Sequence, residues 1–271
     1  METIIESLHQ TIGTYLQQED TVGLLYSGGL DSTVIAHILI SQFPPSGVQA
    51  VSVGAPGSYD LNNALTMAAA INLPLSLCYL SERILIEAIA DLRQLRIITN
   101  PGDLAIVIPL FLGMRTLVKI PKLKTVFLGQ GADELFAGYK KYITLYTEQG
   151  MEATQKAMNH DFNKLMIQQT KIETKIADFF GLKPIYPYLD SRIVKYAQSQ
   201  SISAHLHQMP GGVIIRKNIL RKCAFKLGIP QKAILQPKKA MQYGSGTVKL
   251  LRRLAKSVGY RSVSEWFASD F

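Results

Sequence analysis

A short glycine-containing segment near the start of the chain could bind phosphate. It reads Ser27-Gly28-Gly29-Leu30-Asp31-Ser32, follows the apolar residues 22–26 and opens a stretch with helical spacing of apolar side chains. A glycine turn between a strand and a helix presents backbone N–H groups to an anion. Gly28 and Gly29 allow the backbone to approach phosphate closely, and Ser27 and Ser32 can donate hydrogen bonds. We call residues 27–32 the first glycine turn.

Asp31 within this turn is predicted to hold Mg²⁺, because a carboxylate beside phosphate would otherwise repel it. The segment is neither a Walker A motif nor a G-x-G-x-x-G motif, since it lacks the required lysine and glycine spacing. The alternative is an ordinary strand-to-helix turn in which the aspartate caps the helix.

A second glycine turn, residues 128–134, contains further groups that could act on phosphate. It reads Leu128-Gly129-Gln130-Gly131-Ala132-Asp133-Glu134 and follows another apolar run. Asp133 and Asp31 would together clamp Mg²⁺, while Gln130 and Glu134 would face the reacting centre and Gly129 and Gly131 would lie against the nucleotide. The alternative is that Asp133 caps a helix and Glu134 is a solvated residue of its first turn.

The elements around these turns alternate between strands and helices. Apolar patterns predict strands at residues 22–26, 48–53, 74–80 and 124–128, and helices at residues 3–16, 31–39, 60–71, 82–95 and 104–118. This order predicts an α/β fold, a Rossmann-like parallel sheet with helices on both faces. Parallel strands bind ligands at their carboxyl ends, so the loops at Ser27, Gly54 and Gly129 should converge on one crevice.

The chain after Met151 is predicted to be nearly all helical. No repeat, low-complexity tract or Gly/Ser linker divides the sequence. We therefore expect residues 1–271 to form a single domain, with a nucleotide-binding α/β core in residues 1–150 and a helical, basic part in residues 151–271. A seam between the two parts is expected near Gly150.

The composition is that of a globular protein. The chain has 271 residues, of which 47% are hydrophobic and 18% charged, which excludes disordered, collagen-like and coiled-coil chains. Its longest apolar stretch, residues 105–113, is much shorter than the roughly 20 residues of a membrane span. Met1-Glu2-Thr3 is not the start of a signal peptide. We expect a cytoplasmic protein with no membrane contact.

Positive charge is concentrated in the last quarter of the chain. Residues 201–271 have a net charge of +11 and residues 1–200 a net charge of −2, which suits either nucleic acid or a bound polyphosphate. Lys217, Arg221 and Lys238 are candidates to meet phosphate. Other residues of this quarter are expected to form a solvated helix face, namely Lys222, Lys239, Lys249, Arg252, Arg253 and Lys256.

Cysteine and histidine give no sign of a disulfide or metal site. Cys78 and Cys223 stand alone in apolar surroundings, without a C-x-x-C pair. His205 and His207 lack a third ligand nearby and are expected at the surface. Asp190 could cap the helix that follows it or take part in catalysis, and the sequence favours neither role.

The two glycine turns together resemble the synthetase domain of asparagine synthetases. Ser27-Gly-Gly-Leu-Asp-Ser32 is similar to the PP-loop of ATP pyrophosphatases, and Leu128-Gly-Gln-Gly-Ala-Asp-Glu-Leu-Phe-Ala-Gly-Tyr139 resembles a second block of that domain. Further similar segments follow in order and are Ser52–Asp60, Pro187–Asp190, Arg216–Arg221 and Pro237–Lys239. The stretch from Lys238 to Gly246 resembles free-standing archaeal asparagine synthetase-like proteins and eukaryotic asparagine synthetase-domain-containing proteins.

This resemblance implies an adenine nucleotide alpha hydrolase-like fold that uses ATP and Mg²⁺. By the resemblance, residues 51–54, with Val53 and Gly54 as the binding candidates, meet adenine and ribose through their backbone, and Lys238 contacts the polyphosphate. Tyr139 matches a position near the acyl-adenylate. The reaction implied is adenylation of a carboxylate with release of pyrophosphate, followed by attack of an amine.

The sequence departs from the resemblance where the amine would be handled. Asparagine synthetases have an N-terminal glutaminase domain for which this chain has no room, so we expect free ammonia, another amine or a separate glutaminase subunit. The glutamate of the Gly-Glu-Gly segment is Gln130 here, and a Gly-x-Glu-x-Arg segment has Lys183 and Ile185 in place of Glu and Arg. An amide has no useful basicity, so the amine step is predicted to differ.

The leading hypothesis is therefore an ATP-dependent, amide-forming ligase acting on a small carboxylate and an amine. A tRNA-modifying PP-loop enzyme that adenylates a base is the second, motivated by the basic last quarter. A nucleotide-binding regulator without turnover is the third. The carboxylate, the amine and a homodimeric state are left open.

Overall fold

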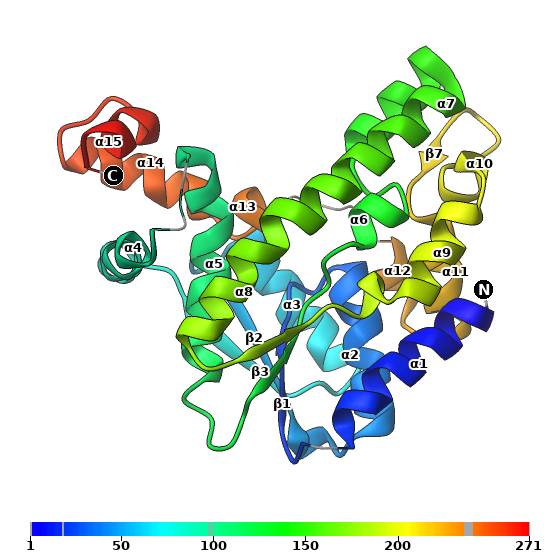
Figure 1. Ribbon diagram of the computed structural model, residues 1–271, viewed down its shortest axis with the longest axis horizontal. Coiled ribbons are helices and arrows are strands. Elements are labelled where there is room, and N and C mark those ends of the chain that lie inside the picture. Colours follow the sequence, from blue (N-terminus) through cyan, green and yellow to red (C-terminus); the bar gives the residue numbers. More distant parts are fainter. Residues whose placement is uncertain (1, 18, 97, 99, 236–240, 271) are drawn as a thin grey trace.

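The chain folds around one parallel sheet. The computed structural model describes residues 2–17, 19–96, 98, 100–235 and 241–270. The strands are β1 (Val22–Leu25), β2 (Val48–Gly54), β3 (Leu75–Tyr79), β4 (Thr125–Phe127) and β5 (Lys183–Ile185), and their spatial order is β3-β2-β1-β4-β5. Every neighbouring pair is parallel, so all five carboxyl ends lie at one edge of the sheet (Figure 1). The predicted α/β fold is confirmed.

Helices cover both faces of this sheet. One face carries α1 (Glu2–Leu16), α2 (Leu30–Gln42), α3 (Tyr59–Ala70), α9 (Ser191–Ser199), α11 (Asn218–Lys226) and α12 (Gln231–Leu235). The other carries α4 (Glu82–Leu95), α5 (Pro101–Leu117), α8 (Thr170–Phe179), α14 (Thr247–Ser257) and α15 (Val263–Asp270). Alternation along β1 explains the two layers, because Leu24 packs into the first core and Leu25 into the second.

The remaining elements are short except for one long helix. They are η1 (Pro45–Gly47), α6 (Ala132–Leu135), α7 (Lys140–Lys164), η2 (Leu165–Gln169), η3 (Pro187–Leu189), α10 (Ile202–His205), β6 (His207–Gln208), β7 (Ile214–Ile215) and α13 (Met241–Gly244). Figure 1 shows α7 and α8 running as an almost continuous rod across the molecule. None of the described helices is long and apolar enough to cross a membrane.

The part after residue 150 is mainly helical but also completes the sheet. β5 pairs with β4 from Thr125↔Lys183 to Phe127↔Ile185, a strand that the sequence did not predict because three residues around Pro184 show no alternation. Gly150, the expected seam, lies within α7 at a kink where its φ is 83°. The division into 1–150 and 151–271, and the single domain, stay predictions.

The sequence predicted that two histidines and the basic side chains of the last quarter lie at the surface, and the structure confirms only part of this. His205 is buried against Phe136, and its Nε2 lies 3.1 Å from the backbone oxygen of Ala197, so its predicted surface position was wrong. His207 is exposed, as expected. The basic residues of α14 are exposed, and Arg253 forms an ion pair of 2.8 Å with Glu82.

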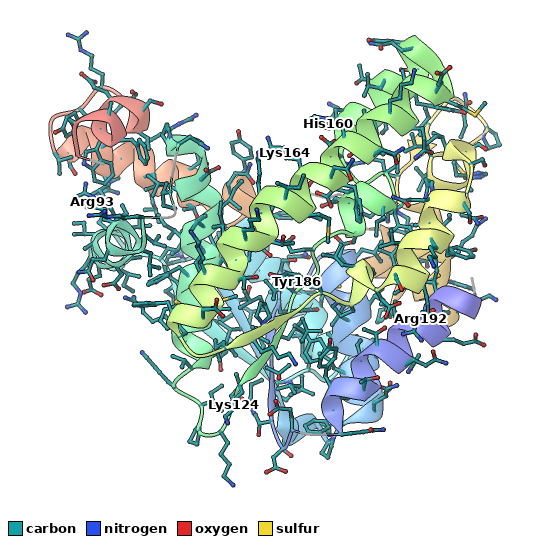
Figure 2. All side chains as sticks on the ribbon, in the orientation of Figure 1. Arg93, Lys124, His160, Lys164, Tyr186 and Arg192 are labelled. Atoms are coloured by element: carbon teal, nitrogen blue, oxygen red, sulfur yellow. The ribbon has the colours of Figure 1, made fainter. Side chains whose placement is uncertain are left out.

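Asp190 links α1 to α9 through side-chain hydrogen bonds. Its Oδ1 accepts the backbone N–H of Arg192 at 2.9 Å, and so caps α9. The hydroxyl of Thr11 in α1 donates to Asp190 Oδ2 at 2.7 Å, and the Arg192 guanidinium donates to both carboxylate oxygens. Figure 2 labels Arg192 where α9 meets α1. The predicted capping role is confirmed.

Replacing this cap tests how strongly it stabilises the fold. We expect Asp190→Ala to lower the free energy of unfolding by about 1–2 kcal/mol at neutral pH, because a cap and its charged partner are lost. The hydrogen bonds from Arg192 and Thr11 lower the pKa of Asp190 below its ordinary 3.8. Its contribution is therefore present above pH 3.8 and lost as the pH falls below that value.

Urea denaturation of the wild type, Asp190→Ala and the exposed control Asp178→Ala would measure this. Equal losses in the two variants, or a difference from the wild type that persists at the lowest pH, would contradict it.

Candidate active site

A cleft of about 340 Å³ opens at the carboxyl edge of the sheet. Both glycine turns line it, together with the end of β2 and the start of α11. The predicted site residues around it are Ser27, Gly29, Asp31, Ser32, Val53, Gly129, Gln130, Asp133 and Lys217. The expectation that the two turns share one crevice is confirmed, since Asp31 and Asp133 meet there.

Lys217 joins these two aspartates. Its Nζ lies 2.5 Å from both carboxylate oxygens of Asp31 and 2.7 Å from Asp133 Oδ1. The lysine side chain is only 5% exposed. Burial lowers the pKa of Lys217, and the neighbouring Asp31 carboxylate acts in the opposite direction. One buried cation therefore holds two carboxylates from different elements within reach of each other.

The local backbone makes room for this ion pair. Lys217 has left-handed backbone angles (φ 56°, ψ 33°) at the start of α11, which direct its side chain into the cleft. Gly138, after the second turn, leaves the space that the pair needs, because a Cβ there would lie 1.9 Å from Asp133 Oδ1 and 2.3 Å from Lys217 Cε. This role of Gly138 was not predicted from the sequence.

The side of the first glycine turn that faces away from the cleft packs against α3. Gly28 has a φ of 70°, and a Cβ there would lie 2.6 Å from the backbone nitrogen of Ala64 in α3. The Asn63 side chain donates to the Gly28 oxygen at 3.0 Å. The hydroxyls of Ser27 and Ser32 lie 3.2 Å apart across the turn. The turn thus presents its hydroxyls and backbone to the cleft while its other side packs on a helix.

The second turn lies directly against the first. Gly129 is so close to Asp31 that a Cβ would meet the Asp31 Cβ at 3.4 Å. Gly131 has a φ of 90° and no room for a side chain beside Leu189. Gly54 does not line the cleft; it ends β2 and packs against Ser58 and the backbone of Ser245. Val53 does line it.

Glu134 lies behind the cleft rather than in its wall. Its carboxylate is buried and accepts a hydrogen bond of 2.6 Å from the hydroxyl of Tyr139, and Tyr139 itself lines the cleft. Burial raises the pKa of Glu134, and the Tyr139 hydrogen bond opposes this shift. Contrary to the expected orientation, Glu134 therefore reaches the cleft through Tyr139.

Gln130 faces the cleft beside a glutamate that the sequence analysis missed. Its Nε2 donates to Oε1 of Glu173 in α8, and Gln169 donates to the same oxygen at 3.0 Å. Glu173 is buried and lines the cleft. Glu173 lies in an amphipathic helix, where a single glutamate looks the same in the sequence whether it faces water or a cleft. The sequence therefore did not predict that it lines the site.

The structure also places Lys183, Ile185 and Arg221. Lys183 is exposed on β5 and lies over the ring of Tyr15, while Ile185 is buried in the first core, and neither lines the cleft. Lys238, predicted to contact polyphosphate, lies outside the described residues. Arg221 lines the cleft and donates to the Arg216 backbone oxygen at 2.8 Å.

The donor set suits a hard cation bound together with phosphate. Among the described residues, no group of three or more His, Cys, Asp or Glu side chains could hold a metal by itself. Mg²⁺ usually takes one or two carboxylates and completes its shell with water and substrate phosphates. Asp31 and Asp133, which already share one ammonium, meet that requirement beside the first glycine turn.

The sequence of this chain matches a known protein family. The asparagine synthase family model matches residues 3–153 and 144–265. The chain belongs to the asparagine synthase family.

The relatives it matches are longer proteins. A Methanocaldococcus jannaschii protein named "Putative asparagine synthetase 1 (glutamine-hydrolyzing)" is 28% identical over 89% of this chain and 49% of its own length. Asparagine synthetase B of Escherichia coli is 24% identical over 89% of this chain and 44% of its own length. This chain spans about half the length of these two relatives. The solved structure of an NMN synthetase from Francisella tularensis aligns with 98% of this chain and 90% of its own, at 10% identity and a TM-score of 0.47.

Removing the bridging ammonium tests its structural role. We expect Lys217→Met to lower the free energy of unfolding by about 3 kcal/mol, because two partly buried carboxylates are left without their shared, buried cation. Lys222→Met, an exposed change on the same helix, is the matched control. Urea denaturation of both variants measures the difference, and a Lys217→Met protein as stable as the control would show that the bridge is unimportant for folding.

Proposed function

We propose that this protein is an ATP-dependent, AMP-forming ligase that joins a carboxylate to an amine. The observation that carries the proposal is the pairing of Asp31 and Asp133 through Lys217 beside the first glycine turn. Membership of the asparagine synthase family supports the same reaction type. The relatives named asparagine synthetase support an amide product without identifying the substrates of this chain.

The first half of the proposed reaction uses the two glycine turns. The carboxylate substrate attacks the α-phosphorus of ATP, a new carboxylate–phosphorus bond forms, and the bond to the β-phosphate oxygen breaks to release pyrophosphate. Ser27, Gly29 and Ser32, which line the cleft, hold the departing pyrophosphate, Gly28 shapes their turn, and Lys217 adds positive charge beside it. Lys238, which lies outside the described residues, is proposed as a further cation for the same phosphate. Mg²⁺ held by Asp31 and Asp133 would neutralise charge as it develops on pyrophosphate.

The second half takes place on the side of the cleft that contains Gln130. An amine attacks the activated carbonyl and AMP leaves. Val51, Ser52 and Val53 line the cleft beyond the glycine turns, where the adenosine would lie. Ammonia, supplied free or by a separate glutaminase subunit, is one candidate amine. A cytoplasmic location fits a supply of ATP and small carboxylates.

Pyrophosphate release tests this function. The purified full chain with Mg²⁺ and ATP would be supplied with a panel of acids (L-aspartate, L-glutamate, succinate and β-alanine) and amines (ammonium, hydroxylamine and methylamine). We expect pyrophosphate and AMP in equal amounts with at least one pair. ATP binding without pyrophosphate from any pair would contradict the proposal.

Variants of the two aspartates link the reaction to the cleft. We expect Asp31→Asn and Asp133→Asn each to slow pyrophosphate release by about 100-fold or more, because each removes a charge that positions Mg²⁺ and pyrophosphate. Asp178→Asn, on the exposed side of α8, should keep the wild-type rate. Unchanged rates in the first two variants would rule out the assigned role.

A further inference from the structure

Glu173 is a buried residue that lines the cleft, and one of its two carboxylate oxygens accepts no hydrogen bond. Its side chain comes from α8 and the whole residue is 2% exposed. Oε1 accepts hydrogen bonds from the amides of Gln130 and Gln169. Oε2 is buried and has no hydrogen-bond partner of acceptable geometry among the described residues.

The groups around Glu173 are neutral or negative. The hydroxyl of Tyr186, from the loop after β5, lies beside the carboxylate without forming a hydrogen bond of good geometry. Glu134 in α6 is near enough for its negative charge to act on the Glu173 carboxylate. No lysine or arginine of the described chain forms an ion pair with it, and on its far side α8 packs on α5 through Phe179 and Phe180. Figure 2 labels Tyr186 near the centre of the molecule.

These surroundings favour a carboxylate that gains and loses a proton. Burial raises the pKa of Glu173 to about 7, with the nearby Glu134 acting in the same direction and the Gln169, Gln130 and Tyr186 groups opposing it. A glutamate that served only packing at this position would destabilise the fold, because a buried carboxylate without a cation is unfavourable. A carboxylate poised near neutral pH suits proton transfer.

Gln130 connects this carboxylate to the amine step. The sequence lacks a carboxylate at position 130, yet the amide that stands there is hydrogen-bonded to Glu173 and both line the same cleft. We propose that Glu173 accepts the proton that the amine loses when it attacks the activated carboxylate. This inference rests on the proposed ligase function and assigns the proton acceptor of its second half.

The proposed step balances as follows. The nitrogen lone pair forms the C–N bond at the activated carbonyl, and the C–O bond to AMP breaks with its electron pair remaining on the phosphate oxygen. One N–H proton passes to the carboxylate of Glu173, a residue that lines the cleft. The protonated Glu173 then releases this proton to solvent. Gln130 and Gln169 hold Oε1 and so fix the orientation of the carboxylate.

The test compares two rates in Glu173→Gln and the wild type. Pyrophosphate–ATP exchange reports adenylation without an amine, whereas amide formation with ammonium chloride reports the complete reaction. Both are measured with the acid of the panel above that gives the fastest exchange. We expect Glu173→Gln to lower amide formation about 100-fold or more relative to exchange, the range of a lost general base.

The pH profile adds an independent readout. In the wild type the ratio of amide formation to exchange, compared at a constant concentration of unprotonated ammonia, should rise with pH up to about 7 and then level, because the ionised form of Glu173 accepts the proton. Glu173→Gln should lose this rise. A profile that keeps the same shape in the variant would overturn the proposal.

An exchange of side chains separates a chemical role from a structural one. The double variant Gln130→Glu/Glu173→Gln keeps one amide and one carboxylate in contact but moves the charge to position 130. We expect it to recover at least tenfold of the amide formation lost in Glu173→Gln. Glu152→Gln, a surface change in α7 whose side chain is 83% exposed, is the control for loss of a glutamate and should match the wild type.

The outcomes separate this inference from the proposed function. Equal losses of exchange and amide formation in Glu173→Gln, or a double variant no faster than it, would overturn the role of Glu173 and leave the ligase function standing. Wild-type exchange without an amide from any amine would overturn the role of Glu173 and the amine step of the ligase function, and would leave only the adenylation step standing. Neither exchange nor amide formation with any acid would overturn the ligase function and this inference together.

Discussion

The site depends on one buried ammonium shared by two carboxylates. Lys217 comes from the start of α11, Asp31 from the first glycine turn and Asp133 from the second, so the ion pair fastens three distant parts of the chain at one point. With Lys217 protonated and both aspartates ionised, the trio has one more negative charge than positive. Arg221 lines the same cleft, so carboxylates that could hold Mg²⁺ and cations that could meet phosphate lie side by side there.

Close packing around this ion pair explains why the second half of the chain matters to a site that begins near residue 27. Gly138 keeps clear the space that Asp133 and Lys217 occupy. The buried hydroxyl of Tyr188 donates to the Asp31 backbone oxygen at 2.9 Å. Residues beyond 150 thus hold the first turn in place, and the helical part contributes to the cleft as directly as the sheet does.

Much of this arrangement could be predicted from sequence because it follows from periodicity and chain order. Alternating strands and helices led to a parallel sheet, and a parallel sheet brings Ser27 and Gly129 to one edge. Glu173 could not be predicted in this way, because a single glutamate in an amphipathic helix looks the same whether it faces water or a cleft. β5 was missed since its pairing with β4, rather than its own three residues, determines it.

The central claim is that Asp31 and Asp133 act on one Mg²⁺–nucleotide complex. Calorimetric binding of the Mg²⁺ complex of α,β-methylene-ATP to the wild type, Asp31→Asn, Asp133→Asn and the double variant tests it directly. The account predicts that the losses in binding free energy are coupled by about 1–3 kcal/mol, as expected for residues in one network. Losses that add independently would contradict a shared site.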